Sequence, residues 1–148
     1  MEKSVFRPEP LSNAAQISLT KWVSMILNND FSDLPSIIAS DAVFLSPVEW
    51  QSYPGRELVC LLLRTAAGVY EDFKYNSELS GDEKAVLEFT AHIGDIQARG
   101  VHIIRFNAGG EFVNIEKMLR PENAVKALGH EMGSKIGPQT KVALSKLN

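Results

Sequence analysis

Two basic side chains, His102 and Lys117, lie in stretches of the sequence that are rich in apolar residues, VHIIRF and VNIEKML. A histidine on an apolar face can act as a general acid or base near neutral pH, or donate a hydrogen bond to a ligand. A desolvated lysine can serve as a base, a Schiff-base former or an anchor for an anion. Each residue also has a purely structural alternative. His102 could be a buried neutral imidazole with one hydrogen-bond partner. The carbon chain of Lys117 could pack in the core while its ammonium group reaches solvent at the mouth of a pocket or pairs with a carboxylate on a helix.

Four aromatic residues are the next candidates for contact with a ligand: Trp22, Phe44, Trp50 and Tyr53. Aromatic side chains of this kind suit flat apolar molecules, and the hydroxyl of Tyr53 can also donate a hydrogen bond. The alternative is that they are simply core residues. Together with the two basic groups, they predict a small hydrophobic ligand that carries one polar or anionic group.

The sequence offers little support for other kinds of site. His92, His102 and His130 have no spacing typical of a metal site, and we expect neither a metal nor another cofactor. Gly109-Gly110 does not precede a helix, as a phosphate-binding loop would. Cys60 lies in an apolar run, which favours a buried inert thiol. No GxSxG motif is present to support a serine nucleophile.

Hydrophobic periodicity predicts which elements hold these residues. Apolar residues at spacings of three and four predict a long helix that starts with Asn13 and Gln16 as a capping box and ends near residues 28–30. A helical turn after Asp33, a strand over 41–47 and a second long helix over 56–70 follow. From Glu71 the period changes to two, which predicts antiparallel strands at about 72–80, 84–93, 96–106 and 111–120. A last helix begins at Pro121 and stops near Gly137-Pro138. This order is typical of an α+β fold.

Turn lengths predict which side chains share a face of the sheet. A two-residue turn at Gly94-Asp95 sets Leu87 opposite His102. A four-residue loop over 107–110 sets His102 opposite Ile115 and Gly100 opposite Lys117, where the glycine leaves room for the lysine. Both basic side chains then point to the core side. The other inward residues assigned to the pocket are Phe89, Ile104, Ile115 and Leu119; a three-residue loop over 81–83 would add Phe73, Tyr75 and Leu79.

The outward face of the same sheet mixes polar and apolar residues. It is too polar for a core and too apolar for a fully solvated surface, so we expect either a homodimer through this face or scattered exposed apolar side chains.

Length and composition place limits on the class of protein. The 148 residues are 45% hydrophobic and 22% charged, which is typical of one globular domain over 1–148, with a core at about 11–137 and a peripheral N-terminal arm and C-terminal tail. The net charge of −3 gives no general attraction to nucleic acid or to a membrane surface. The single cysteine and the absence of an apolar leader favour the cytoplasm.

Three segments carry a resemblance to a known family: DAVFLSPV (41–48), YPGRE (53–57) and VHIIRFNAGGEFVNIEKMLRP (101–121). With the predicted order of elements, the chain resembles the nuclear transport factor 2-like superfamily, and most of all its SnoaL-like branch. The resemblance covers about 11–137. It implies a cone-shaped barrel, in which helices cover the concave face of a curved antiparallel sheet around an internal cavity. It also implies a dimer through the outer face.

The resemblance does not fix the chemistry, because the superfamily includes isomerases, cyclases, hydrolases, dehydratases and proteins without catalytic activity. SnoaL-like cyclases typically place a His-Trp-Asp stretch on the last strand, and this chain has Ile115-Glu116-Lys117 there. We therefore expect a ligand-binding protein with His102 and Lys117 as the tentative catalytic or orienting pair. The alternatives are an isomerase, cyclase or hydratase with His102 as general acid or base, and a non-catalytic dimeric interaction module with a filled pocket.

Overall fold

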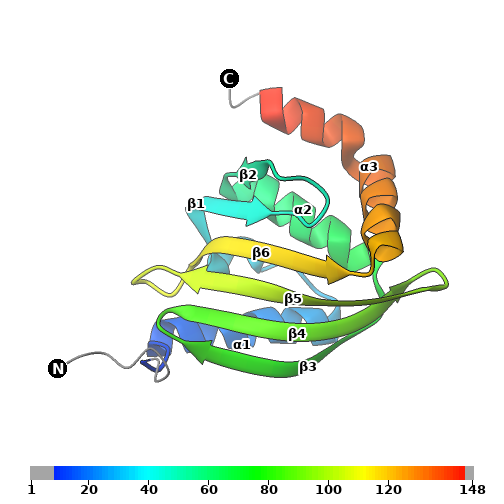
Figure 1. The fold of residues 1–148 in the computed structure, drawn as a ribbon. Helices are drawn as coiled ribbons and strands as arrows, with labels where there is room; N and C mark the ends of the chain where they lie inside the picture. Colours follow the sequence, from blue (N-terminus) through cyan, green and yellow to red (C-terminus); the bar gives the residue numbers. More distant parts are fainter. Residues whose placement is uncertain (1–8, 146–148) are drawn as a thin grey trace.

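The computed structural model describes residues 9–145, with side-chain surroundings given for residues 9–137. Residues 1–8 of the predicted arm and 146–148 of the predicted tail lie outside the described part. In chain order the elements are α1 (Asn13–Asn28), the 3-10 helix η1 (Leu34–Ile37), β1 (Ile38–Leu45), β2 (Ser52–Pro54), α2 (Arg56–Val69), β3 (Glu71–Gly81), β4 (Lys84–Ile93), β5 (Ile96–Phe106), β6 (Phe112–Arg120) and α3 (Glu122–Ser145) (Figure 1).

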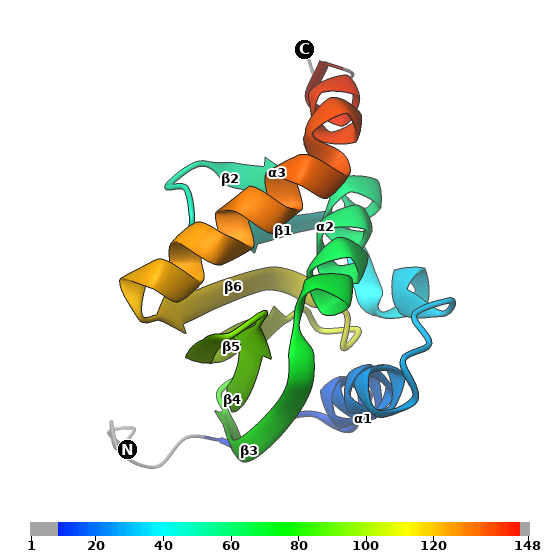
Figure 2. The same cartoon turned by 90° about the vertical axis from the view of Figure 1, so that its right-hand side faces the viewer.

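The strands form one curved sheet in the order β2-β1-β6-β5-β4-β3. Figure 2 shows the sheet from its end, with α1 and α2 on the concave side and α3 crossing over β6. The predicted α+β fold class is confirmed. The sheet is not purely antiparallel, since β1 runs parallel to β6, and it remains open between its edge strands β2 and β3. A parallel pair is possible here because a long connection through α2 and four strands separates β1 from β6 in sequence.

The helix ends differ from the prediction in two places. Ser12, one residue before the predicted cap, is the N-cap of α1, because its Oγ accepts a hydrogen bond from the Ala15 backbone N–H at 3.1 Å. At the other end of the chain, α3 continues through Gly137-Pro138 to Ser145, so the predicted stop is wrong. A proline inside a helix removes one backbone hydrogen bond and bends the axis, and Figure 1 shows α3 changing direction along its length.

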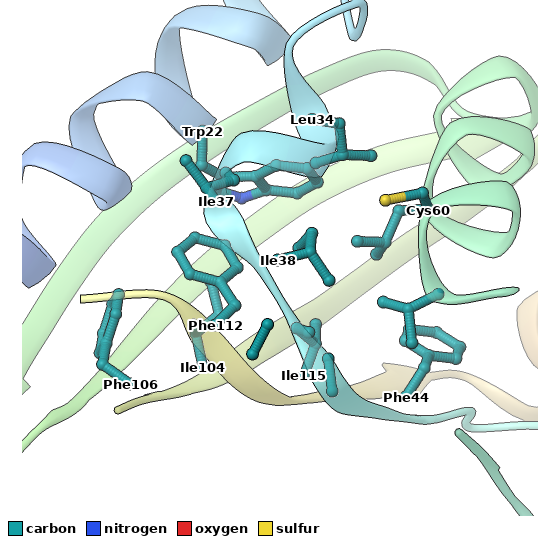
Figure 3. Close-up of a cluster of buried hydrophobic side chains, with 14 of the residues drawn as sticks. Trp22, Leu34, Ile37, Ile38, Phe44, Cys60, Ile104, Phe106, Phe112 and Ile115 are labelled. Carbon is teal, nitrogen blue, oxygen red and sulfur yellow. The ribbon is translucent and has the colours of Figure 1, made fainter. Parts of the chain in front are cut away.

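The concave face of the sheet forms the core, as the alternation of β4 and β5 predicts. Every second residue of β4, from Ala85 to Ile93, is buried, and so is every second residue of β5 from Ala98 to Phe106. Figure 3 shows how Trp22 of α1 meets Ile38 of β1 and Phe112 of β6 in this core. The helices thus cover the face on which His102 lies.

One residue predicted on the concave face lies on the other side. Leu79 is 74% exposed. The β3–β4 turn has two residues, Asp82 and Glu83, both with positive φ, and the pairing shifts between Tyr75 and Ser77. A one-residue bulge reverses the faces beyond it, so Tyr75 stays inward while Leu79 turns outward.

The outer face of the sheet carries a half-exposed Met118, with 49% of its surface accessible. A homodimer through this face stays a prediction. Within the described residues, none of the helices has the length and apolar character needed to cross a membrane.

Candidate functional site

His102 and Lys117 lie directly opposite each other on β5 and β6. The predicted partners were Ile115 for His102 and Lys117 for Gly100. The pairing differs from the prediction by two residues, because the loop between β5 and β6 is one residue longer than assumed and a bulge interrupts the pairing between Arg105 and Phe106. A two-residue shift preserves the face, so both side chains still point inward, with only 4% and 3% of their surfaces exposed.

Of the two ring nitrogens of His102, only Nδ1 has a hydrogen-bond partner among the described residues. Its Nδ1 lies 2.5 Å from the Tyr75 hydroxyl, and that hydroxyl accepts a hydrogen bond from Trp22 Nε1 at 2.9 Å. The indole N–H occupies a lone pair of this hydroxyl, and among the described residues the only acceptor in reach of the hydroxyl hydrogen is His102 Nδ1, so Tyr75 donates to that nitrogen. This assigns the imidazole hydrogen to Nε2, which is buried and has no partner among the described residues.

Burial decides the protonation state of this histidine. Removal from water lowers the pKa of His102 well below its usual range, and the nearby charge of Lys117 lowers it further. The ring is also packed against aromatic neighbours, with centroids 4.9 Å from Phe89 and 6.0 Å from Phe73. His102 is therefore a neutral hydrogen-bond donor at physiological pH.

Lys117 is a buried amine without a carboxylate partner. No hydrogen bond or ion pair of Lys117 is found within the described part of the chain, in contrast to Lys126, which pairs with Glu122. Its Nζ instead lies over two aromatic rings, 4.9 Å from the centroid of Tyr70 and 5.8 Å from that of Phe44. Burial lowers the pKa of Lys117 to about 7, so charged and neutral forms coexist near neutral pH.

A third polar group, the hydroxyl of Tyr70, belongs to the same site. It is buried and has no hydrogen-bond partner among the described residues. Burial raises the pKa of Tyr70, so the phenol keeps its hydrogen and remains a donor. Tyr70 was not predicted as a site residue, because the apolar pattern of the second helix already explained it as part of the core.

Two cavities lie next to Lys117 and Ala66, and both of these residues line each cavity. The first, of about 280 Å³, lies beneath α3, and its wall includes Phe44, Tyr53, Leu62, Leu128, Met132 and Ile136. The second, of about 360 Å³, is walled by residues that include Trp22, Phe31, Tyr70, Phe73 and His102. Of the described residues that line the second cavity, none is Asp or Glu.

The predicted pocket residues divide into three groups. Trp22, Phe44 and Tyr53 do line these cavities. Trp50 does not: it lies in the loop before β2 and is fully exposed, so its place differs from the prediction. The remaining predicted residues are core or sheet positions outside both cavity walls: Phe89, Ile104 and Ile115 are buried, and Leu119 is half-buried.

Tyr53 has its own partner at the rim of the first cavity. Its hydroxyl donates a hydrogen bond to Glu49, and burial together with this carboxylate raises the pKa of Tyr53 to about 12. In the described part of the chain, no three His, Cys, Asp or Glu side chains are grouped so that they could hold a metal ion.

Solved structures resemble this fold closely. A structure described as a steroid delta-isomerase from Pseudomonas aeruginosa is 37% identical in sequence, with a TM-score of 0.85, and the match covers 88% of this chain and 97% of that one. A bacterial protein with a cystatin-like fold from Silicibacter pomeroyi is 25% identical, with a TM-score of 0.78 and coverage of 84% and 88%. An NTF2-like protein of unknown function from Mesorhizobium loti has a TM-score of 0.68 at 18% identity, with coverage of 78% and 98%. The chain belongs to the NTF2-like superfamily.

NTF2-like membership confirms the resemblance predicted from the three segments. At 18% identity the Mesorhizobium protein supports the fold alone. No protein-family model matches the chain, and no curated protein matches it. The chemistry of this NTF2-like chain must therefore be argued from the residues of its own cavities.

Proposed function

We propose that the protein binds a small apolar molecule with one polar or anionic oxygen group, and that His102 and Lys117 orient this group. The observation that supports the proposal is the unpaired state of His102 Nε2 beside an apolar cavity of about 360 Å³. A buried donor without a partner destabilises a fold by about 1–3 kcal/mol. A ligand oxygen that accepts from His102 and Lys117 would remove this deficit.

The size and lining of the cavity agree with this proposal. Pockets for small molecules start at about 300 Å³ and are mostly apolar, with a few convergent polar groups. Trp22, Phe31 and Phe73 supply the apolar walls, and the two basic groups lie together on one side. The presence of cavities also favours a binding or catalytic protein over an interaction module with a filled pocket.

Trp22 provides a direct readout of binding, because it lines the second cavity. The only other tryptophan, Trp50, is fully exposed, so the variant Trp50→Phe leaves Trp22 as the single reporter without touching the site. We would titrate this variant with naphthoate, naphthalene and naphthylamine, which share an aromatic body and differ in their polar group.

The proposal predicts that naphthoate changes the Trp22 fluorescence and binds more tightly than naphthylamine. Adding Lys117→Met to the reporter variant should weaken naphthoate binding about tenfold, which is typical of one charge-assisted hydrogen bond. Adding Lys126→Met, which removes an exposed lysine, should leave binding unchanged. Absence of binding by all three probes would show that the proposal is wrong.

A second candidate function is double-bond isomerisation, favoured by the 37% identity to a protein described as a steroid delta-isomerase. Such a reaction needs a base that moves a proton and donors that stabilise an enolate oxygen. With Nδ1 accepting from Tyr75 and the hydrogen on Nε2, the geometry favours His102 as a donor and leaves the role of base to another group. Lys117 would take the proton, and His102 and Tyr70 would donate to the oxygen.

This candidate is tested with an unconjugated ketosteroid, whose conversion to the conjugated ketone raises ultraviolet absorbance. If the candidate is right, wild type turns over this steroid and Lys117→Met abolishes turnover. If wild type gives no turnover although naphthoate binds, the binding function stands without the isomerase activity.

A further inference from the structure

The amine of Lys117 is buried without a hydrogen bond or an ion pair among the described residues. Fully buried lysines are rare and usually paired with a carboxylate, because burying an unpaired charge is unfavourable. Lys117 is 3% exposed and lies over the rings of Tyr70 and Phe44, and no ion pair of this residue is found in the described part of the chain. Its side chain nevertheless lines both cavities. The amine thus faces the space that a ligand would fill.

We infer that Lys117 binds its ligand covalently, by condensing with the carbonyl carbon of an apolar ketone or aldehyde to form an imine. This inference rests on the proposed function, since the same cavities must hold the molecule, and it names the polar group as a carbonyl. The nitrogen lone pair attacks the carbonyl carbon and the C–N bond forms. The two amine hydrogens and the carbonyl oxygen leave as water, and nothing is oxidised or reduced. Hydrolysis reverses the step and releases the molecule.

The surroundings of Lys117 favour this step. Only the neutral amine is nucleophilic, and an apolar site favours the neutral form. At pH 8 a lysine with a pKa of about 7 has roughly three hundredfold more neutral amine than a lysine with the ordinary pKa of 10.5. His102, directly across the strand pair, presents its Nε2 hydrogen, and Tyr70 presents its hydroxyl. These donors can stabilise the oxygen of the carbonyl as the nitrogen attacks.

The position of Lys117 between two cavities also indicates the shape of the ligand. A carbonyl carbon bonded to Nζ lies next to both cavities, beside Ala66. One part of the molecule then extends among Trp22, Phe31 and Phe73, and another extends beneath α3 towards Leu128 and Met132. We therefore expect a ketone with an apolar group on each side in preference to a carbonyl with one such group.

Dibenzoylmethane is a suitable probe, because its central diketone carries a phenyl ring on each side. The imine of a diketone rearranges to a conjugated enaminone, which absorbs in the near ultraviolet and needs no reductant to be trapped. We would incubate wild type with dibenzoylmethane at pH 6, 7, 8 and 9 and follow the new absorbance. Intact-mass measurement and peptide mapping would then locate the adduct. Benzoylacetone, with one phenyl ring, is the comparison probe.

The expected result is one adduct per chain, on Lys117, whose rate of formation rises with pH around a midpoint near 7. Lys117→Met should lose the adduct, and Lys126→Met, which removes an exposed lysine, should keep it. Methionine has nearly the shape of the lysine stem and no charge, so this variant keeps the core filled. Benzoylacetone should react more slowly than dibenzoylmethane.

Failure of this inference is distinguishable from failure of the proposed function. If naphthoate binds beside Trp22 but no enaminone forms, or if Lys117→Met is labelled like wild type, imine formation is wrong and non-covalent binding stands. If neither naphthoate nor dibenzoylmethane engages the protein, both are wrong. Equal rates for the two diketones would overturn the preference for two apolar groups.

Discussion

Replacing Lys117 with methionine should stabilise the protein at neutral and acidic pH. Lowering the pKa of Lys117 from 10.5 to about 7 corresponds to about 5 kcal/mol against the charged form in the folded state, at 1.36 kcal/mol for each pH unit. Between pH 7 and 10.5 the unfolded chain holds the lysine proton and the folded protein has released it. The free energy of unfolding of wild type therefore rises with pH across this window and is lowest, as far as this group is concerned, below pH 7.

Lys117→Met has no such titration, so the comparison isolates the effect of one amine. At pH 6 the variant should be more stable than wild type by several kcal/mol, with about 5 kcal/mol as the upper value, and the difference should close as the pH approaches 10.5. Urea unfolding of both proteins at pH 6, 8 and 10 measures it. Lys126→Met is the matched control, because Lys126 is exposed and pairs only with Glu122 one turn away, an interaction of about 0.5 kcal/mol or less.

Two results would refute this reasoning. A variant that is less stable than wild type at pH 6 would mean that the ammonium contributes a favourable interaction within the fold. A difference that stays constant from pH 6 to pH 10 would mean that the folded protein does not lower the pKa of Lys117. Either result would also remove the chemical basis for imine formation at neutral pH.

Three further predictions concern other buried positions. Gly100→Ala should destabilise the protein by about 2–3 kcal/mol in urea unfolding, because the new Cβ would lie 2.2 Å from a backbone oxygen and 2.8 Å from the ring of Phe89; Gly133→Ala in α3, where the Cβ meets nothing, should not destabilise it. Nitrogen-detected NMR should show His102 as the neutral Nε2–H form at pH 7 and still neutral below pH 6.5. Because a histidine in the unfolded chain takes up a proton in this range and His102 in the folded protein does not, the free energy of unfolding of wild type should decrease as the pH falls. The Cys60 thiol, whose pKa is raised by burial, should resist Ellman's reagent in the folded protein and react fully in urea.

The faces of the strands were predictable because they depend only on whether a residue is odd or even along the strand. His102 and Lys117 point inward as predicted, although the β5–β6 pairing differs from the prediction by two residues. Leu79 shows the limit of the method, because its inward place required a three-residue loop over 81–83 and the turn has two residues. A single-residue bulge in β3 then keeps Tyr75 inward. Bulges depend on local packing that a pattern of apolar residues does not contain.

The side-chain contacts between helices and strands were harder to predict from the sequence than the strand faces. The hydrogen bonds that join Trp22, Tyr75 and His102 connect α1, β3 and β5, and they require the curvature of the whole sheet. An inward tyrosine was a usable signal, because a buried hydroxyl needs a partner. Trp50 was assigned to the pocket by its residue type alone, and loops have no periodicity that could have placed it outside.

His102 and Lys117 are polar residues in the wall of the second cavity, and they lower the stability of the empty protein. Equivalent inward positions two residues away on the same strands are the isoleucines Ile104 and Ile115, both essentially inaccessible to water. The sheet can therefore fill this face with apolar side chains. At the next positions it instead holds an imidazole whose Nε2 has no partner among the described residues, and an amine that lies over the rings of Tyr70 and Phe44. Each unpaired donor is unfavourable by about 1–3 kcal/mol, a large part of the roughly 5–15 kcal/mol that stabilises a domain. A ligand whose oxygen or carbonyl group meets these donors would offset that loss, so tighter binding and a less stable empty protein follow from the same two residues.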